Sequence, residues 1–229
     1  QQLGVFGKTN KFLIPFIKDL FKYWQSKFLR VGYSFNTDSL FDISELIPNS
    51  FSSLHRVNQE VDCSIPKEAI WKGISDTKQK HIRRGERTVE LANKDALVAI
   101  DWFLKGETGL SLNLKPKQIA LLHKLVEAFS IRNMLIAYTV VNKESKEPML
   151  GLLQTRYSNR IISLFGGPTN KAKDNYAQDY SLWQTMQLIA GLPNAVLDFE
   201  GSNLRGVQQY NAAFGAVIKH YQHVTYKRW

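Results

Sequence analysis

Residues 196–224, VLDFEGSNLRGVQQYNAAFGAVIKHYQHV, carry the pattern that decides the fold class. A short apolar run gives way to polar turn residues, then to a helix, and then to a second strand-like run. Gly215 is predicted to end the helix, because the residue just past a helix end often needs a left-handed backbone. The predicted elements are a buried strand over 196–199, a turn over 200–203, a helix from about 204 to 214, and a last strand.

Two carboxylates, Asp198 and Glu200, fall where the first of these strands opens into its turn. Ligands of open α/β sheets bind just outside the carboxyl ends of strands. We therefore expect the chemistry of this protein at that strand end.

The order of elements in the whole chain predicts a mixed α/β sheet flanked by helices. Residues 1–55 are interpreted as the remainder of a first domain, and residues 56–229 as a second domain. The strands predicted outside the deciding stretch cover 3–6, 31–35, 56–63, 134–141, 149–156 and 160–165. The helices cover 10–30, 66–84, 94–104, 115–130 and 176–190, with loops over 105–114 and 166–174.

The helix over 10–30 carries an aromatic stripe at four-residue spacing. We expect this stripe to pack into a core, although a basic amphipathic helix can also lie on a membrane. The stripe consists of Phe12, Phe16, Leu20, Trp24 and Phe28.

Composition limits the classes of protein to which the chain can belong. Its formal net charge of +10 favours association with polyanions, and leaves nucleic acid, a phosphate-rich cofactor and an anionic membrane surface open. The single cysteine, Cys63, excludes an internal disulfide framework and favours a reducing, cytoplasmic compartment. No apolar run reaches the roughly 20 residues that cross a bilayer, so no stable membrane insertion is expected.

The loop over 166–174 is the predicted binding site for a phosphate-bearing donor molecule. Paired glycines allow a ligand to approach the backbone closely, and the following helix offers free amide groups and a positive dipole. Its lysines add charge for phosphates, although a solvated loop with unrelated lysines is the alternative. The predicted donor-binding residues are Gly166, Gly167, Thr169, Lys171, Lys173, Asn175 and Tyr176.

A second basic feature is the helical row Lys80, Arg83, Arg84 and Arg87. It predicts contact with a polyanion such as the backbone of tRNA, with a solvated helix surface as the alternative. Such binding weakens steeply with salt.

No metal site is predicted. Cys63 has no cysteine partner, and His220 and His223 lie three apart on a predicted strand, so they point to opposite faces. All five histidines are interpreted as surface or core residues.

Three segments together resemble acyltransferases of the GNAT superfamily, and more narrowly the Fem-like branch, which adds amino acids to peptidoglycan bridge peptides. The resemblance covers DFEGS at 198–202 with the helix ending FGA and Tyr221, QQLGVF at 1–6, and EAIWKGISDTKQKHIRRGER at 68–87. It implies a GNAT-like fold, with residues 1–55 belonging to an N-terminal GNAT-like domain. It also implies an N-acyltransferase whose acceptor is an amine of unknown identity.

The resemblance leaves two donors open, acyl-CoA and aminoacyl-tRNA. In the superfamily, the loop between a central strand and its helix holds the pyrophosphate of acetyl-CoA through the motif Gln/Arg-x-x-Gly-x-Gly/Ala. The loop over 166–174 lacks this motif, which favours the Fem-like branch.

Amide formation needs a neutral amine and a proton source for the leaving group. Glu200 is the preferred base and Asp198 the second candidate, and the lysines of the donor loop are expected to lie beside Glu200. Many GNAT enzymes use a tyrosine four residues before the helix-ending glycine, but that position holds Asn211 here. The candidates for the acid are therefore Tyr210, Tyr176 and Tyr221.

Two alternatives to this mechanism remain. Transfer can rely on positioning, with no dedicated acid. The chain can also be a GNAT-like binding module that has lost its chemistry.

Overall fold

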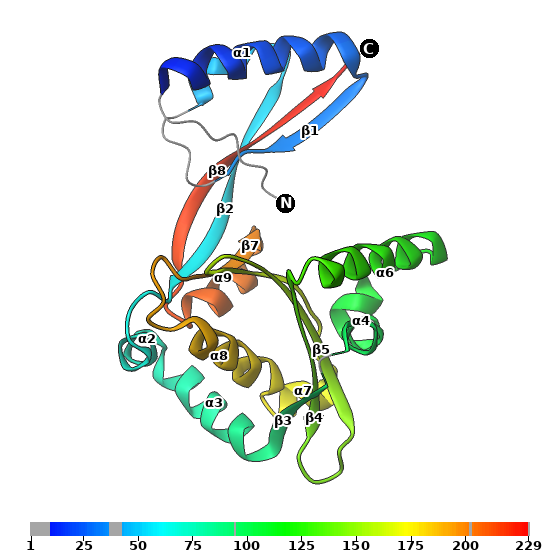
Figure 1. The fold of residues 1–229 in the computed structure, drawn as a ribbon, viewed down its shortest axis with the longest axis vertical. Helices are drawn as coiled ribbons and strands as arrows, with labels where there is room; N and C mark the ends of the chain where they lie inside the picture. The colour runs from blue at the N-terminus through cyan, green and yellow to red at the C-terminus, as the bar shows by residue number, and fades with distance from the viewer. Residues whose placement is uncertain (1–9, 37–42, 94, 202, 229) are drawn as a thin grey trace. The chain divides into compact units, whose positions relative to one another are not determined.

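The computed structural model describes residues 10–36, 43–93, 95–201 and 203–228. Its strands follow the order β1-β8-β2-β7-β6-β5-β4-β3 in a mixed sheet flanked by helices, as Figure 1 shows. The chain divides into two compact units. Unit 1 comprises Gln1–Gln59, Gly201–Gln208 and Ile218–Trp229, and unit 2 comprises Glu60–Glu200 and Gln209–Val217.

Unit 1 contains helix α1 (Asn10–Lys27), strand β1 (Arg30–Ser34) and the short 3-10 helix η1 (Ser44–Leu46). It also holds most of β2 (Ser52–Asp62) and β8 (Val217–Lys227). β1 and β8 pair in antiparallel fashion. The expected strand over residues 3–6 lies outside the described residues. The core of unit 1 is formed by Ile17, Phe21, Trp24, Phe35, Ile43, Phe51 and Val224.

Helix α1 buries only part of the predicted stripe, since Trp24 is buried and Leu20 packs against the core of unit 1. Phe12, Phe16 and Phe28 remain 72%, 55% and 45% exposed. Apolar side chains cover more than half of this helix, so their spacing marks the apolar arc without showing which part of the arc meets the core. The row that is actually buried consists of Leu13, Ile17, Phe21 and Trp24.

Unit 2 contains the strands that continue the sheet from β7 to β3. β3, β4, β5 and β6 form antiparallel neighbours, whereas β6 and β7 are parallel. The sequence predicts four of these strands and misses β3. Their bounds are β3 (Val89–Asn93), β4 (Leu135–Asn142), β5 (Pro148–Tyr157), β6 (Arg160–Gly166) and β7 (Val196–Gly201).

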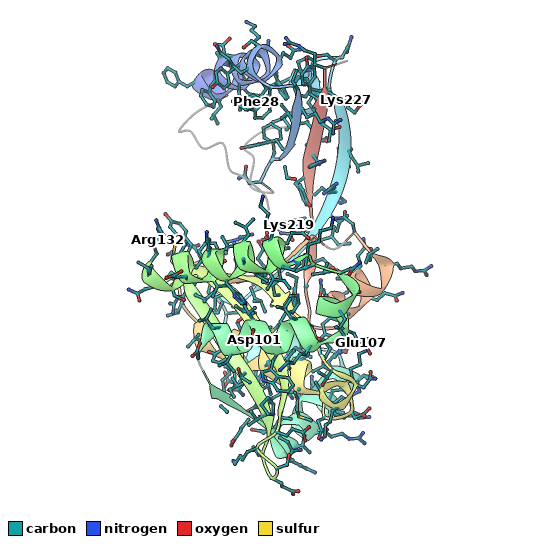
Figure 2. All side chains as sticks on the ribbon, turned by 90° about the vertical axis from the view of Figure 1, so that its right-hand side faces the viewer. Phe28, Asp101, Glu107, Arg132, Lys219 and Lys227 are labelled. Carbon is teal, nitrogen blue, oxygen red and sulfur yellow. The ribbon has the colours of Figure 1, made fainter. Side chains whose placement is uncertain are left out.

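Helices cover both faces of this part of the sheet. α4 (Ala96–Lys105) and α6 (Pro116–Ile131) lie on one face, and α8 (Ala177–Ile189) lies on the other (Figure 1). Figure 2 views the first face, with Asp101 labelled on α4 and Arg132 after the end of α6. α4 packs so closely on β5 that a Cβ at Gly151 would lie 1.7 Å from the carbonyl oxygen of Ala99.

The predicted helix over 66–84 is in fact two helices, α2 (Lys67–Gly73) and α3 (Asp76–Thr88). Ser75 causes the break, because its side chain caps α3 by accepting a hydrogen bond from the amide of Lys78. Two segments predicted as loops contain short helices, α5 (Glu107–Ser111) and α7 (Asn170–Asp174).

The deciding stretch folds as expected. β7 is followed by α9 (Arg205–Ala212), which ends before the predicted end at Phe214, and Gly215 in the following turn has the predicted left-handed φ of 80°. The assignment of residues 1–55 to an N-terminal GNAT-like domain stays a prediction.

Candidate functional site

The carboxylate of Asp179 is the centre of a buried polar cluster in unit 2. Both of its oxygens lie 2.8 Å from the ammonium nitrogen of Lys78. Nδ1 of His81 lies 3.0 Å from one oxygen, and the hydroxyl of Tyr210 donates to the other at 2.7 Å. The Asp179 side chain is only 7% exposed, so its charge is balanced within the cluster rather than by water.

Asp179 fixes the orientation of the His81 ring. As the ion-pair partner of Lys78, the carboxylate can only accept hydrogen bonds, so Nδ1 of neutral His81 carries the proton and Nε2 keeps its lone pair. The ring also stacks on Tyr176, with centroids 4.2 Å apart and planes at 24°. The His81 side chain is 29% exposed, which leaves it accessible to a ligand.

Tyr210 holds Lys78 as well as Asp179. The Lys78 ammonium lies 3.9 Å from the centroid of the Tyr210 ring, within range of a cation–π interaction. Burial, the charge of Asp179 and the hydrogen bond to it raise the pKa of Tyr210 well above its ordinary value of 10.0. Tyr210 is therefore a weak proton donor, and its position suits it to holding the cluster in place.

The cluster lines a pocket of about 350 Å³. The walls come from α3, α8, the unit 2 part of α9, and the segment with α7 that directly follows β6. The pocket is therefore assembled at the carboxyl end of a central strand, the kind of place where open α/β sheets bind ligands. The lining residues are Lys78, His81, Pro168, Ala172, Lys173, Tyr176, Gln178, Asp179 and Tyr210.

β6 itself is irregular on the way to this pocket. It pairs with β7 from Arg160 opposite Val196 to Ile162 opposite Asp198, and then continues to Gly166. Beyond the paired stretch, Leu164 is the extra residue of a bulge against β5. Bulges of this kind re-aim a strand and often lie next to active sites.

Two of the predicted donor-binding residues, Lys173 and Tyr176, line the pocket. The lysines of the loop already have acidic partners, since Lys171 pairs with Glu147 and Lys173 with Glu107. The side chain of Thr169 donates to the carbonyl oxygen of Met149 and caps α7.

The other predicted donor-binding residues have structural contacts. A Cβ at Gly166 would contact Leu152, and one at Gly167 would contact Phe103. The side chain of Asn175 donates to the carbonyl oxygen of Lys171.

The backbone corner before α8 is closed rather than open to phosphate. The amides of Asn175 and Tyr176 donate to the carbonyl oxygens of Lys171 and Lys173. Gly85 of α3 covers the corner, because a Cβ there would lie 3.1 Å from the Tyr176 carbonyl oxygen and 3.4 Å from that of Asn175. These two amides cannot hold a pyrophosphate without breaking their present bonds.

The carboxylates of β7 occupy a different environment. Asp198 pairs with Arg160, which also pairs with Glu60, and it accepts a hydrogen bond from the amide of Glu200. Burial raises the pKa of Glu200, and a left-handed φ of 58° fixes its backbone. Arg160 therefore balances the charge of Asp198, and Asp198 holds the Glu200 backbone.

The expected placement of Lys171 and Lys173 beside Glu200 is not what the structure shows. Their partners are the acids named above, and Glu200 is not among the residues that line the pocket. Figure 1 draws the arrowhead of β7 well away from α7. β6 and β7 pair only where Arg160–Ile162 faces Val196–Asp198, so the pairing stops before the donor loop and before Glu200.

Among the tyrosine candidates for the acid, Tyr210 and Tyr176 meet at the pocket, while Tyr221 is a buried residue of unit 1. Asn211 is also buried. On α9, it is therefore Tyr210 and not Asn211 whose side chain contacts Asp179.

The predicted basic row is exposed on α3, the helix that also supplies Lys78 and His81 to the pocket. Arg84 donates to the hydroxyl of Tyr176 at 3.2 Å, and Arg83 lies 5.5 Å from the ring of Trp71. Lys80 and Arg87 are exposed. The row and the pocket are thus joined through Tyr176.

Sequence reasoning missed Lys78, His81 and Asp179 as a site. His81 and Asp179 are 98 positions apart, and no local spacing signals their contact. Within the described ranges, no group of three or more histidine, cysteine, aspartate or glutamate side chains could hold a metal ion, and no helix is long and apolar enough to cross a membrane. Burial raises the pKa of the Cys63 thiol to about 12, so this cysteine is inert at neutral pH.

Comparisons with known proteins find the fold and not the sequence family. No family model and no curated protein matches the sequence. Among solved structures, FemX superposes with a TM-score of 0.68 at 12% identity, over 93% of this chain and 77% of that one.

Two further structures match over almost the whole chain. L-PGS from Bacillus licheniformis has a TM-score of 0.57 at 12% identity, over 99% of this chain and 78% of its own. The C-terminal domain of a putative lysylphosphatidylglycerol synthetase from Agrobacterium fabrum has a TM-score of 0.58 at 9% identity, over 96% and 74%. The expected mixed α/β, GNAT-like fold of the Fem-like type is confirmed. Identities this low show the fold alone.

Proposed function

We propose that this protein transfers an acyl or aminoacyl group onto an amine, and that His81 is the general base. The observation that carries the proposal is the contact between Asp179 and Nδ1 of His81 at the floor of a pocket, in a fold shared with FemX. A carboxylate that holds an imidazole in one tautomer is a recurring way to prepare the other ring nitrogen as a base.

In the proposed step, His81 carries one proton from the amine to the leaving group. Nε2 of His81 takes a proton from the incoming ammonium, and the amine forms a bond to the acyl carbon. The bond from that carbon to the donor oxygen or sulfur breaks, and the imidazolium returns the proton to this leaving group. The attacking nitrogen releases its second proton to water, which leaves a neutral amide. Asp179 stabilises the imidazolium while it carries the proton.

Lys78 and Lys173 line the same pocket, where Lys78 is paired with Asp179 and Lys173 with Glu107. Asp179 and Tyr210 hold Lys78 in a fixed position, so its remaining N–H can donate to a substrate oxygen without reorganisation. Asp198, which is bound to Arg160, is assigned a structural role.

We favour aminoacyl-tRNA as the donor over acyl-CoA. The amides of Asn175 and Tyr176 are occupied by backbone bonds, which argues against a pyrophosphate at this corner. The exposed row of Lys80, Arg83, Arg84 and Arg87 suits a longer polyanion. The cytoplasmic location stays a prediction.

The test is a transfer assay with two donors. The protein is incubated with a pool of aminoacylated tRNA or with acetyl-CoA, together with peptides that carry a free lysine amine. Mass spectrometry then measures the acylated peptide. We expect transfer from aminoacyl-tRNA, weakening steeply as salt is raised.

The decisive variant is His81→Asn, because the asparagine amide can replace the Nδ1 donor to Asp179 but cannot act as a base. Its rate should fall by about 100-fold or more, while the matched variant His123→Asn on α6 should keep the wild-type rate. A rate unchanged in His81→Asn excludes His81 as the base.

Glu200→Gln separates the two candidate bases. If this variant abolishes transfer while donor binding persists and His81→Asn remains active, the base is Glu200. If the protein binds a donor but transfers nothing in any arm, it is a binding module with a transferase fold.

A further inference from the structure

The exposed side of α1 carries a ridge of large apolar side chains. Phe12 is 72% exposed, Phe16 55% and Tyr23 52%. At about 100° per residue, these three positions fall within one narrow arc of the helix. The ridge continues past the end of the helix, since the rings of Tyr23 and Phe28 are 6.1 Å apart and Leu29 is 69% exposed.

This ridge is distinct from the face of α1 that packs into unit 1. The buried row of Leu13, Ile17, Phe21 and Trp24 lies roughly 100° further round the helix. Among the described residues, the aromatic ridge is therefore separate from the core of unit 1. Exposed aromatic clusters of this kind mark surfaces for proteins or membranes.

Positive charge lies on α1 beside the ridge and on its flank. Lys18, Lys22 and Lys27 are exposed, with Lys27 about 40° from the centre of the ridge, Lys22 about 100° and Lys18 about 140°. The only acid of the helix, Asp19, lies 3.3 Å from the ammonium nitrogen of Lys22. Arg30 follows Phe28 and Leu29 in the chain and lies opposite Lys227 where β1 pairs with β8. Arg228 donates a hydrogen bond to the carbonyl oxygen of Gln25. Phe28 and Lys227 are both labelled in Figure 2, at the α1 end of unit 1.

The charge excess of the whole chain is concentrated in this unit. Unit 1 has eleven lysines and arginines against four aspartates and glutamates, which is +7 of the chain's +10. An occupant of the ridge must therefore be apolar at its contact and anionic around it.

We propose that α1 binds the surface of an anionic lipid bilayer, lying in the plane of the interface. Phe12, Phe16 and Tyr23 enter the boundary between headgroups and acyl chains, and the lysines contact lipid phosphates. The proposal does not depend on the transferase reaction, because it concerns unit 1 alone.

Co-sedimentation with vesicles tests it. The whole chain is mixed with vesicles of phosphatidylcholine alone, or with about 30% phosphatidylserine added. We expect the partition coefficient to be at least about tenfold higher on the anionic vesicles, and to fall as sodium chloride is raised, because salt screens surface charge.

Two variants separate the apolar and the charged contributions. Phe12→Ser/Phe16→Ser/Tyr23→Ser should lower partitioning by about tenfold or more, and Lys18→Gln/Lys22→Gln/Lys27→Gln should remove most of the preference for anionic vesicles. The matched control is Leu121→Ser/Leu125→Ser on α6, whose side chains are 67% and 40% exposed. It should bind like the wild type, and circular dichroism checks that all variants fold.

Three outcomes overturn the proposal. Equal binding to both vesicle types removes the role of charge, and unchanged binding of the aromatic variant removes the ridge. If neither vesicle binds, and ultracentrifugation shows a wild-type dimer that the aromatic variant loses, the ridge is a contact between copies of this chain.

Discussion

Lys78 of α3 and Asp179 of α8 form a bidentate ion pair, with the ammonium nitrogen 2.8 Å from each carboxylate oxygen. The two residues are 101 positions apart in the chain. Because Asp179 also contacts His81 and Tyr210, this single carboxylate links the packing of α3, α8 and α9 to the orientation of the candidate base.

Removing one partner of this pair should cost considerable stability. Lys78→Met keeps the side-chain length but leaves Asp179 buried without its cation, so the free energy of unfolding should fall by about 3 kcal/mol. Urea denaturation measures the change. The double variant Lys78→Met/Asp179→Leu should recover most of the loss, and a single variant as stable as the wild type would contradict this account.

Tyr210 should make stability depend on alkaline pH. Its pKa is raised in the folded state, so above about pH 10 the unfolded chain loses this proton first and unfolding becomes more favourable. The wild type should therefore lose stability as pH rises from 9 to 11, and Tyr210→Phe should lose less. Thermal melts across this range give the comparison, and parallel curves would show that Tyr210 does not contribute.

Glu200 should show the corresponding effect at acidic pH. Burial raises the pKa of Glu200 above 4.5, so the folded state favours the protonated carboxyl group. The stability that Glu200 contributes is therefore present at low pH and is lost as pH rises through its folded-state pKa. Glu200→Gln should be at least as stable as the wild type at pH 7. Chemical denaturation at pH 4 and pH 7 tests this, and a clear loss at pH 7 would mean that the charged carboxylate is stabilising.

Gly85 should be required where α3 crosses α8. A Cβ at this position would lie 2.9 Å from the Cβ of Tyr180, so Gly85→Ala forces the two helices apart and should cost about 1–3 kcal/mol. Gly206→Ala in α9 is the matched control, because nothing lies within 4 Å of its added Cβ. Equal stability of the two variants in urea would argue against close packing at Gly85.

The two lysines of the donor loop should behave differently towards an anion. Lys173 lines the pocket and Lys171 does not, although each has an exposed acidic partner. Lys173→Gln should weaken the binding of aminoacyl-tRNA by about tenfold, and Lys171→Gln should not. Both should lose less than about 1 kcal/mol of stability, since exposed ion pairs contribute little. Calorimetry measures the affinity of both variants, and an equal loss of affinity in the two would contradict this prediction.

The sequence by itself determined the elements whose signals are local. The hairpins of β4, β5 and β6 and the later order of α8, β7, α9 and β8 follow from runs of apolar residues and from turns. Gly215 forms the turn after α9 because glycine accepts a left-handed backbone. The break between α2 and α3 was missed even though Ser75 carries a capping signal, because the apolar spacing on both sides is continuous.

The tertiary structure alone brought Lys78, His81 and Asp179 together and decided which face of α1 is buried. His81 and Asp179 meet only because α3 crosses α8, and nothing near either residue in the chain encodes that crossing. In α1, the apolar arc is wider than one contact face, so its periodicity is compatible with several rotations of the helix. Contacts between distant segments select one rotation, and they leave Phe12, Phe16 and Tyr23 exposed.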